Sequence, residues 1–161
     1  MHAPGERIRT SSAVTVRRLS ASDVSPTLSI LEESPETVMW SRASLLESAA
    51  GRAVWVAELE GRVAGILIGQ AAADEFEILN LAVSKKCRRR GLATRLVNAA
   101  LESARSAGAR QAYLEVRASN EGAIALYTRI GFRAGGRRIN YYRDPVEDAV
   151  QLVLHKLGTT R

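Results

Sequence analysis

Five cationic side chains fall within six residues, Lys85 to Arg90, and Gly91 and Ala93 follow them directly. The apolar residues Ile78, Leu79, Leu81, Ala82 and Val83 precede this basic turn, and an amphipathic helix begins after it. The first amides of a helix have no intrahelical partner, and the helix dipole favours an anion at that end. Residues without large side chains let a ligand approach the backbone, and arginines add charge-assisted hydrogen bonds. The segment therefore predicts a phosphate-binding turn, with a solvated basic turn before a surface helix as the alternative.

The spacing of the small residues excludes two familiar nucleotide-binding signatures. The turn contains neither Gly-x-Gly-x-x-Gly nor Gly-Lys-Ser/Thr, so neither a Rossmann fingerprint nor a P-loop is supported. Arg88, Gly91 and Ala93 do fit Arg/Gln-x-x-Gly-x-Gly/Ala. This pattern resembles the pyrophosphate-binding signature of the GNAT superfamily of N-acetyltransferases, and the resemblance implies acetyl-coenzyme A (acetyl-CoA) as cosubstrate.

Length and composition indicate one globular domain. The chain has 161 residues, 46% of them hydrophobic and 25% charged. No apolar run approaches the roughly 18 to 20 residues of a membrane helix, and the N-terminus has no apolar signal segment. Cys87 is the single cysteine, so we expect no internal disulfide and a cytoplasmic location. The two histidines, His2 and His155, lie at opposite ends of the chain, so we expect no metal site. We predict a disordered tail over residues 1–12 and a single domain over residues 13–157.

The pattern of apolar residues predicts a strand-rich α/β (α+β) order with a strand–helix–strand–helix unit in its second half. The expected strands are residues 14–19, 54–58, 63–69, 77–83, 111–117, 132–139 and 149–154. The expected helices are residues 21–33 and 41–50, one that begins at Leu92 and is closed by Gly108, and 120–130. The third helix carries an apolar face of Leu92, Leu96, Val97, Ala100, Leu101 and Ala104.

A second resemblance covers the second half of the chain. The stretch LEVRASNEGAIALYTRIGF, residues 114–132, is followed by Asn140-Tyr141-Tyr142 and by Glu147-Asp148-Ala149. Together they closely resemble the bacterial ribosomal-protein-alanine N-acetyltransferases, GNAT enzymes that acetylate protein N-termini. The resemblance runs from about residue 74 to residue 154, and Trp40-Ser41 is the short piece recognised before it. It implies the GNAT fold: a central mixed, mostly antiparallel sheet of six to seven strands, a splayed central strand pair and about four flanking helices.

The resemblance also implies roles for individual residues. The catalytic base matches Glu115 and the catalytic acid matches Tyr127. The residues matched to acetyl-CoA are Leu81, Ala82 and Val83 in a bulged strand, Arg88, Arg89, Arg90, Gly91, Leu92, Ala93 and Thr94 in the turn, and Asn120 and Tyr127 beyond it. The residues matched to the peptide groove are Tyr141 and Tyr142, with Trp40 as a further candidate. The chain departs from the family where Lys85, Lys86 and Cys87 replace residues that usually include a proline and an aromatic, which leaves the shape of the turn open.

Each of these residues also has a plainer interpretation. Glu115 alternates with apolar Leu114 and Val116, so it faces away from them, either into a cleft or toward Arg117 or another arginine. A tyrosine in the middle of a helix is commonly a core aromatic with its hydroxyl at the edge, and an asparagine before a helix is commonly its cap. The remaining alternatives are strand aromatics for Tyr141 and Tyr142, a core residue for Trp40, and a surface residue without catalytic role for Cys87.

The resemblance implies direct acetyl transfer to the N-terminal α-amine of a protein, with a ribosomal protein as partner. An α-amine has a pKa near ~8, against roughly 10.4 for lysine, so a modest base suffices. A lysine or small-molecule amine is the alternative acceptor, although the carboxylates of Asp74, Glu75 and Glu77 look scattered. A non-catalytic acetyl-CoA sensor is disfavoured by Glu115 with Tyr127, and a nucleic-acid binder by the lack of aromatics beside the basic turn. We expect no nucleic-acid or membrane partner and a monomer or weak dimer.

Overall fold

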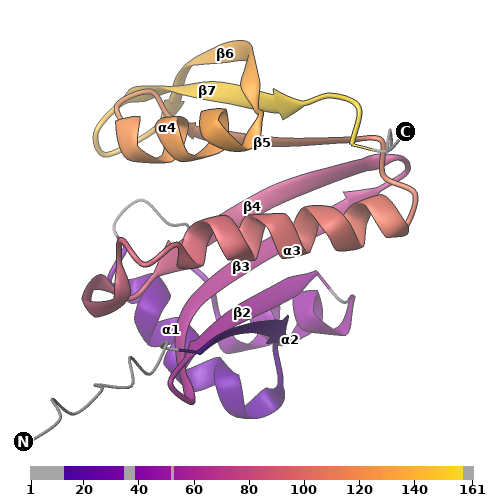
Figure 1. The fold of residues 1–161 in the computed structure, drawn as a ribbon. Coiled ribbons are helices and arrows are strands. Elements are labelled where there is room, and N and C mark those ends of the chain that lie inside the picture. Colours follow the sequence, from indigo (N-terminus) through magenta and orange to yellow (C-terminus); the bar gives the residue numbers. More distant parts are fainter. Residues whose placement is uncertain (1–12, 35–38, 52, 158–161) are drawn as a thin grey trace, which may run out of the picture.

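The computed structural model describes residues 13–34, 39–51 and 53–157, and it contains one seven-stranded sheet in the order β1-β2-β3-β4-β5-β7-β6 (Figure 1). The strands are β1 (Val14–Arg18), β2 (Val54–Leu59), β3 (Arg62–Ala72), β4 (Glu75–Val83), β5 (Gln111–Arg117), β6 (Arg133–Tyr142) and β7 (Glu147–Leu154). The helices in this part of the chain are α1 (Val24–Glu32), α2 (Arg42–Ala50), α3 (Leu92–Ser106) and α4 (Glu121–Ile130), with 3-10 turns at Ala21–Asp23 and Lys85–Cys87. The predicted tail over residues 1–12 lies outside the described residues.

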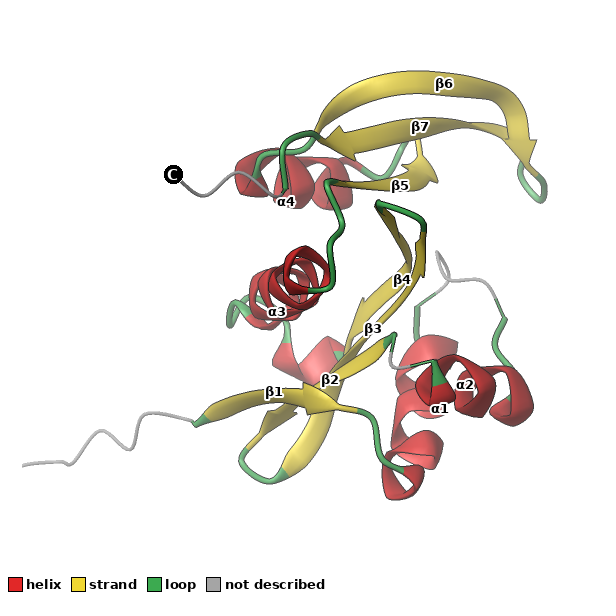
Figure 2. Ribbon diagram, turned by 90° about the vertical axis from the view of Figure 1, so that its right-hand side faces the viewer, coloured by secondary structure: helices red, strands yellow, loops and turns green. Residues whose placement is uncertain are grey.

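Strands β4 and β5 form the parallel pair of this otherwise antiparallel sheet, and they are hydrogen-bonded over only a short stretch. Their ladder joins residues 75–77 to residues 111–113. Because β4 continues to Val83 and β5 to Arg117, the two strands diverge beyond the ladder. Figure 2 shows the result: β1–β4 with α1, α2 and α3 form one half of the molecule, and β5–β7 with α4 form the other. The predicted mostly antiparallel sheet with a splayed central pair is confirmed.

A β-bulge interrupts β4 just before the strands diverge. Ile68 of β3 pairs with Asn80, but the next residue, Gly69, pairs with Ile78, so Leu79 is an extra residue on β4. A side chain at Gly69 would collide with the ring of Phe76, so this position requires glycine. The bulge exchanges the faces of β4: Phe76 and Ile78 before it belong to one hydrophobic cluster, whereas after it Leu81 and Val83 pack against that cluster and Ala82 belongs to the other.

Two hydrophobic clusters cover the two faces of the sheet. All six residues of the predicted apolar face of α3 are buried in the first cluster, on the side that α4 shares through Tyr127. The second cluster joins α1 and α2 to the opposite face of β2 and β3. Figure 2 shows α3 on one side of β1–β4 and the pair α1 and α2 on the other. None of the described helices has both the length and the hydropathy of a membrane span.

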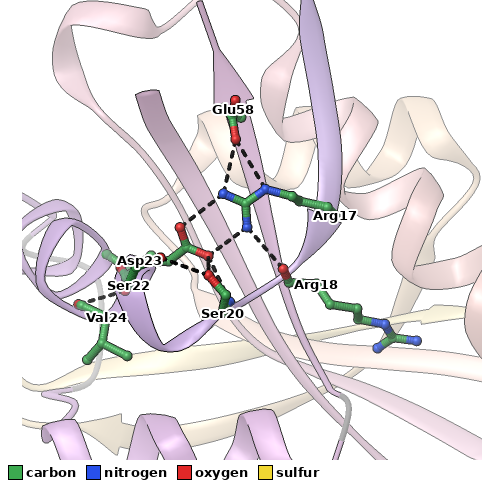
Figure 3. Close-up of polar contacts among 8 residues, drawn as sticks. Arg17, Arg18, Ser20, Ser22, Asp23, Val24 and Glu58 are labelled. Atoms are coloured by element: carbon green, nitrogen blue, oxygen red, sulfur yellow. Dashed lines mark hydrogen bonds and ion pairs between the residues drawn. The ribbon is translucent and has the colours of Figure 1, made fainter. Parts of the chain in front are cut away.

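An ionic network fixes the start of α1 against the sheet (Figure 3). Arg17 of β1 donates to both carboxylate oxygens of Asp23, at 2.6 and 3.0 Å, and to Glu58 of β2, at 3.1 and 3.0 Å. The guanidinium of Arg17 lowers the pKa of Asp23 to about 2. The buried Asp23 is therefore ionised at neutral pH and links β1 and β2 to the helix that covers the second cluster.

Strands β3 and β6 differ most from their predicted bounds, and β3 spans Arg62–Ala72 rather than residues 63–69. The change in β6 bears on the predicted site. Strand β6 spans Arg133–Tyr142 rather than residues 132–139, so Tyr141 and Tyr142 are part of the strand. Nearly every residue of this edge strand is exposed, and its sequence therefore lacks the apolar alternation that marks strand ends. The predicted helix over residues 21–33 begins instead with the 3-10 turn and becomes α-helical at Val24.

Candidate active site

A cleft of about 610 Å³ lies beside the N-terminus of α3. Its walls come from the end of β4, the basic turn, the first residues of α3 and the exposed side of α4. The lining residues are Ser34, Leu81, Ala82, Val83, Cys87, Arg88, Arg89, Gly91, Leu92, Ala93, Thr94, Asn120, Gly122, Ala123, Leu126 and Arg129. The structure thus gathers all but Arg90 and Tyr127 of the residues that the resemblance matched to acetyl-CoA.

The backbone of the basic turn is held open toward this cleft. Gly91, the N-cap of α3, has φ +77°, and a Cβ built there would meet nothing within 4 Å. Within the described chain no side chain caps this end of α3, so the first amides of the helix are available to an anion. Arg88 Nε donates to the carbonyl oxygen of Val83 at 3.3 Å, which ties the turn to the end of β4. Free helical amides beside arginines fit a pyrophosphate.

The unusual Lys85-Lys86-Cys87 sequence forms a 3-10 turn. Cys87 N donates to the carbonyl of Ser84 at 2.9 Å, and Lys85 N donates to the carboxylate of Glu33 at 3.2 Å. Cys87 is half-buried and lines the cleft rather than lying on the open surface. The turn therefore keeps a defined shape without the proline that is usual in the family.

A second, smaller pocket of about 100 Å³ opens where β4 and β5 diverge. It is lined by Ile78, Leu79, Asn80, Leu81, Leu114, Glu115, Val116, Arg117, Asn120, Ala123, Tyr127 and Tyr142. Three of these residues, Leu81, Asn120 and Ala123, also line the first cleft. The inner pocket is therefore contiguous with the cleft, and it holds both residues predicted for acid–base chemistry.

Tyr127 reaches the inner pocket from α4 and is 3% exposed. Its ring packs edge-to-face on Phe132, with the ring centroids 5.4 Å apart. Burial raises the pKa of Tyr127 well above its ordinary value. The phenol is therefore protonated throughout the physiological range and is a donor rather than an acceptor of a proton.

Glu115 lines the inner pocket from β5, and its side chain is 14% exposed. Its Oε1 lies 3.1 Å from Arg138 Nε on β6, so the carboxylate has an arginine partner. That partner is not Arg117, which instead lies 3.4 Å from Glu147 and stacks 4.5 Å from the ring centroid of Tyr142. Arg138 is 62% exposed, and such a solvated pair leaves the carboxylate accessible at low energetic cost.

A third cleft, of about 650 Å³, reaches Glu115 along the sheet. Its lining residues are Glu75, Glu77, Gln111, Tyr113, Glu115, Gly135, Arg138, Gln151, Val153 and His155. Glu75 and Glu77 looked scattered in the sequence, but here they join Glu115 in one acidic cleft. Tyr113 Oη donates to Glu77 at 3.2 Å, and Gln111 donates to Glu75. Glu115 therefore lines both the inner pocket and an acidic approach to it.

The remaining predicted site residues differ in whether they line a cavity. Tyr142 lines the inner pocket, whereas Tyr141 lies outside it, 48% exposed, with its ring 5.1 Å from that of Tyr142. Trp40 is half-buried against the second hydrophobic cluster and lines none of the three cavities. Asn120 caps α4, because its Oδ1 accepts from the amide of Ala123 at 3.2 Å. Its predicted contact with coenzyme A stays a prediction.

Arg129 and Asn80 are among the lining residues that were not singled out from the sequence. Arg129 adds a cation to the first cleft from the last turn of α4. Asn80 lies in the inner pocket, where it interrupts an otherwise apolar strand segment. A lone amide in such a run is the signal that could have identified it, because buried polar side chains require a partner.

A family model described as "Acetyltransferase (GNAT) family" matches residues 19–132. The chain belongs to the GNAT acetyltransferase family. A relative named "[Ribosomal protein bS18]-alanine N-acetyltransferase" from Escherichia coli strain K12 is 32% identical over 143 residues, covering 87% of this chain and 96% of the relative. "Putative [ribosomal protein bS18]-alanine N-acetyltransferase" from Bacillus subtilis is 34% identical over 139 residues, covering 84% and 91%.

The fold agrees with this membership. The crystal structure of the ribosomal-protein-S18-alanine N-acetyltransferase from Escherichia coli superposes with a TM-score of 0.81 at 29% identity, covering 92% of this chain and 97% of that one. This GNAT protein is therefore an acetyl-CoA-dependent N-acetyltransferase, as the resemblance of the basic turn to the GNAT signature implied.

We expect acetyl-CoA to raise the melting temperature of this GNAT protein, and Gly91→Val to weaken that binding by at least about tenfold, roughly 1.4 kcal/mol. The valine side chain would enter the space in front of the α3 amides and strain a backbone with φ +77°. Gly108→Val is the matched control, because Gly108 has φ +101° at the other end of α3 and lines none of the cavities. Calorimetric titration of both variants measures the affinities, and equal losses would contradict the phosphate-binding role of the turn.

Proposed function

We propose that this chain transfers the acetyl group of acetyl-CoA to the N-terminal α-amine of a protein, and that this protein is a ribosomal protein beginning with alanine. The observation that carries the proposal is the position of the inner pocket, which shares lining residues with a basic cleft and, through Glu115, with an acidic one. The names of the Escherichia coli and Bacillus subtilis relatives support an alanine α-amine as acceptor.

Glu115 and Tyr127 divide the proton transfers in this proposal. A protonated α-amine must lose a proton before it attacks, and Glu115 accepts that proton directly or through a water molecule. The amine nitrogen bonds to the acetyl carbonyl carbon as the carbon–sulfur bond breaks, and Tyr127 donates its proton to the departing thiolate. The nitrogen then releases its second proton, which returns to the Tyr127 phenolate directly or through water, so that the products are the neutral amide and the free thiol. Acetyl-CoA supplies an activated thioester that needs no covalent enzyme intermediate. The two side chains reach the same pocket from different elements, Glu115 from β5 and Tyr127 from α4.

The acidic cleft also favours a second candidate acceptor, a lysine side chain or a small cationic amine. Glu75, Glu77 and Glu115 together attract a cation, and a protonated N-terminus, a lysine and a polyamine all present one. The α-amine remains the leading acceptor because its pKa of about 8 leaves a useful neutral fraction at pH 7, whereas lysine at roughly 10.4 does not.

A competition between three acceptors tests the proposal. We expect a peptide with a free N-terminal alanine to be acetylated on its α-amine at least about tenfold faster than two comparison acceptors, because only its amine is substantially neutral. These are the same sequence with a blocked N-terminus and an internal lysine, and a free polyamine. Mass spectrometry locates the acetyl group, and preferential modification of lysine or polyamine would move the chain to the second candidate.

A further inference from the structure

We propose that the side-chain amide of Asn80 donates a hydrogen bond to the carbonyl oxygen of the acceptor's first residue, and that it thereby selects a peptide N-terminus over other amines. This inference rests on the proposed function. It assigns a specificity-determining contact to a residue that carries no acid–base role in the mechanism above.

Asn80 is a buried polar group without a partner. The residue is 8% exposed, and its Nδ2 is buried without a hydrogen-bond acceptor in the described part of the chain. Buried polar groups in folded proteins are almost always hydrogen-bonded, and an unpaired donor destabilises the native state. Asn80 lines the inner pocket together with Glu115 and Tyr127, so the amide stands beside the atoms that react. A ligand in that pocket is the partner that the fold does not provide.

The bulge at Leu79 determines which way Asn80 faces. In a regular strand Asn80 would share a face with Ile78, which lies in the cluster under α3. Because Leu79 is an extra residue, the alternation shifts, and Ala82, two residues after Asn80, belongs to the cluster under α1 and α2. Asn80 is thus removed from the α3 core and brought to the point where β4 and β5 diverge.

The Asn80 side-chain amide is placed to contact the acceptor rather than the thioester of acetyl-CoA. Asn80 lines the inner pocket but not the first cleft, whereas Ala82 and Val83 line the first cleft and Leu81 lines both. The β4–β5 ladder ends at residue 77, so main-chain groups at the end of β4 have no partners in β5. In this proposal those main-chain groups bind the thioester of acetyl-CoA. The side-chain amide is left for the acceptor. A peptide carries a carbonyl oxygen next to its α-amine, whereas a lysine side chain or a polyamine carries none there.

Asn80→Leu, which keeps the side-chain size and removes the amide, tests the contact against a matched pair of acceptors. One is the alanine-initiated peptide, and the other carries a trans-alkene in place of its first peptide bond and so lacks the carbonyl oxygen. We expect Asn80→Leu to lower kcat/KM for the normal peptide by about tenfold relative to the parent enzyme. For the alkene peptide, kcat/KM of the variant should stay within about twofold of the parent, because this peptide has no carbonyl oxygen that could bond to Asn80. Asn98→Leu, on the exposed side of α3, is the control and should change neither value.

Two further measurements separate this role from a structural one. The melting temperature of Asn80→Leu should equal or exceed that of the parent, because an unpaired buried donor is removed. Its affinity for acetyl-CoA should be unchanged. Equal losses on both peptides, or no loss on either, would overturn the assignment. The parent enzyme is assayed first on the normal peptide: inactivity there refutes the proposed function, whereas activity with equal losses refutes only the role of Asn80.

Discussion

Tyr127→Phe is expected to lower kcat by about 10²- to 10⁴-fold, the range of a lost general acid or base. The substitution removes one hydroxyl and keeps the ring, which is 3% exposed and packed edge-to-face on Phe132. Burial raises the pKa of this phenol, so the parent carries the proton at every pH at which the enzyme is assayed. The thiolate of coenzyme A then departs without a proton donor in the variant. Steady-state release of coenzyme A measures kcat, and acetyl-CoA affinity should be nearly intact.

Tyr113→Phe is the matched control for this loss. The Tyr113 hydroxyl donates to Glu77 in the acidic cleft and lies outside the inner pocket, so its removal should change kcat little. A large loss of acetyl-CoA affinity in Tyr127→Phe, with kcat retained, would instead make Tyr127 a cosubstrate contact. If the melting temperatures of the two variants fall by the same amount, misfolding does not explain a difference between their rates.

The parts of the fold that follow from local periodicity were predictable. The helix α3 buries the six residues that its 3.6-residue period selects, and Gly108 follows its last turn with φ +101°. On β5 the two-residue period places Leu114 in the core and Glu115 in a cleft. The basic turn was recognisable because an anion site at a helix N-terminus needs residues that are contiguous in sequence.

Features that depend on pairing between distant segments were not predictable. The arginine partner of Glu115 comes from β6, and the sequence gives no register for an edge strand with exposed side chains on both faces. Glu75 and Glu77 join Glu115 only because β4 and β5 pair for three residues before they diverge. Asn80 escaped notice because its orientation is set by a bulge, which depends on the ring of Phe76 against Gly69.

Glu115→Gln is expected to lower kcat/KM by about 10²-fold at pH 7, with a deficit that shrinks as the pH rises above about 8. Below that pH most α-amine is protonated, and the parent uses the carboxylate to remove the proton. Above it the solution supplies neutral amine, which recovers up to about tenfold of the deficit, because about one α-amine in ten is already neutral at pH 7. Glutamine keeps the shape of the side chain on β5 and cannot accept a proton. A pH–rate profile of both enzymes measures the effect, and Tyr127→Phe should show no such recovery, because alkaline solution supplies no proton to the thiolate.

Arg138→Gln separates catalysis by Glu115 from its ion pair. The Glu115–Arg138 contact is 3.1 Å long, but Arg138 is largely exposed, and such pairs contribute at most about 1 kcal/mol. If the carboxylate acts on the amine, Arg138→Gln should stay within about fivefold of the parent and keep its pH profile, since the base is still present. If Glu115 only anchors β6 through this arginine, the two variants should lose the same activity at every pH. Matching losses without alkaline recovery would therefore contradict the role of Glu115 as base and leave Tyr127 as the sole proton-transfer residue of the inner pocket.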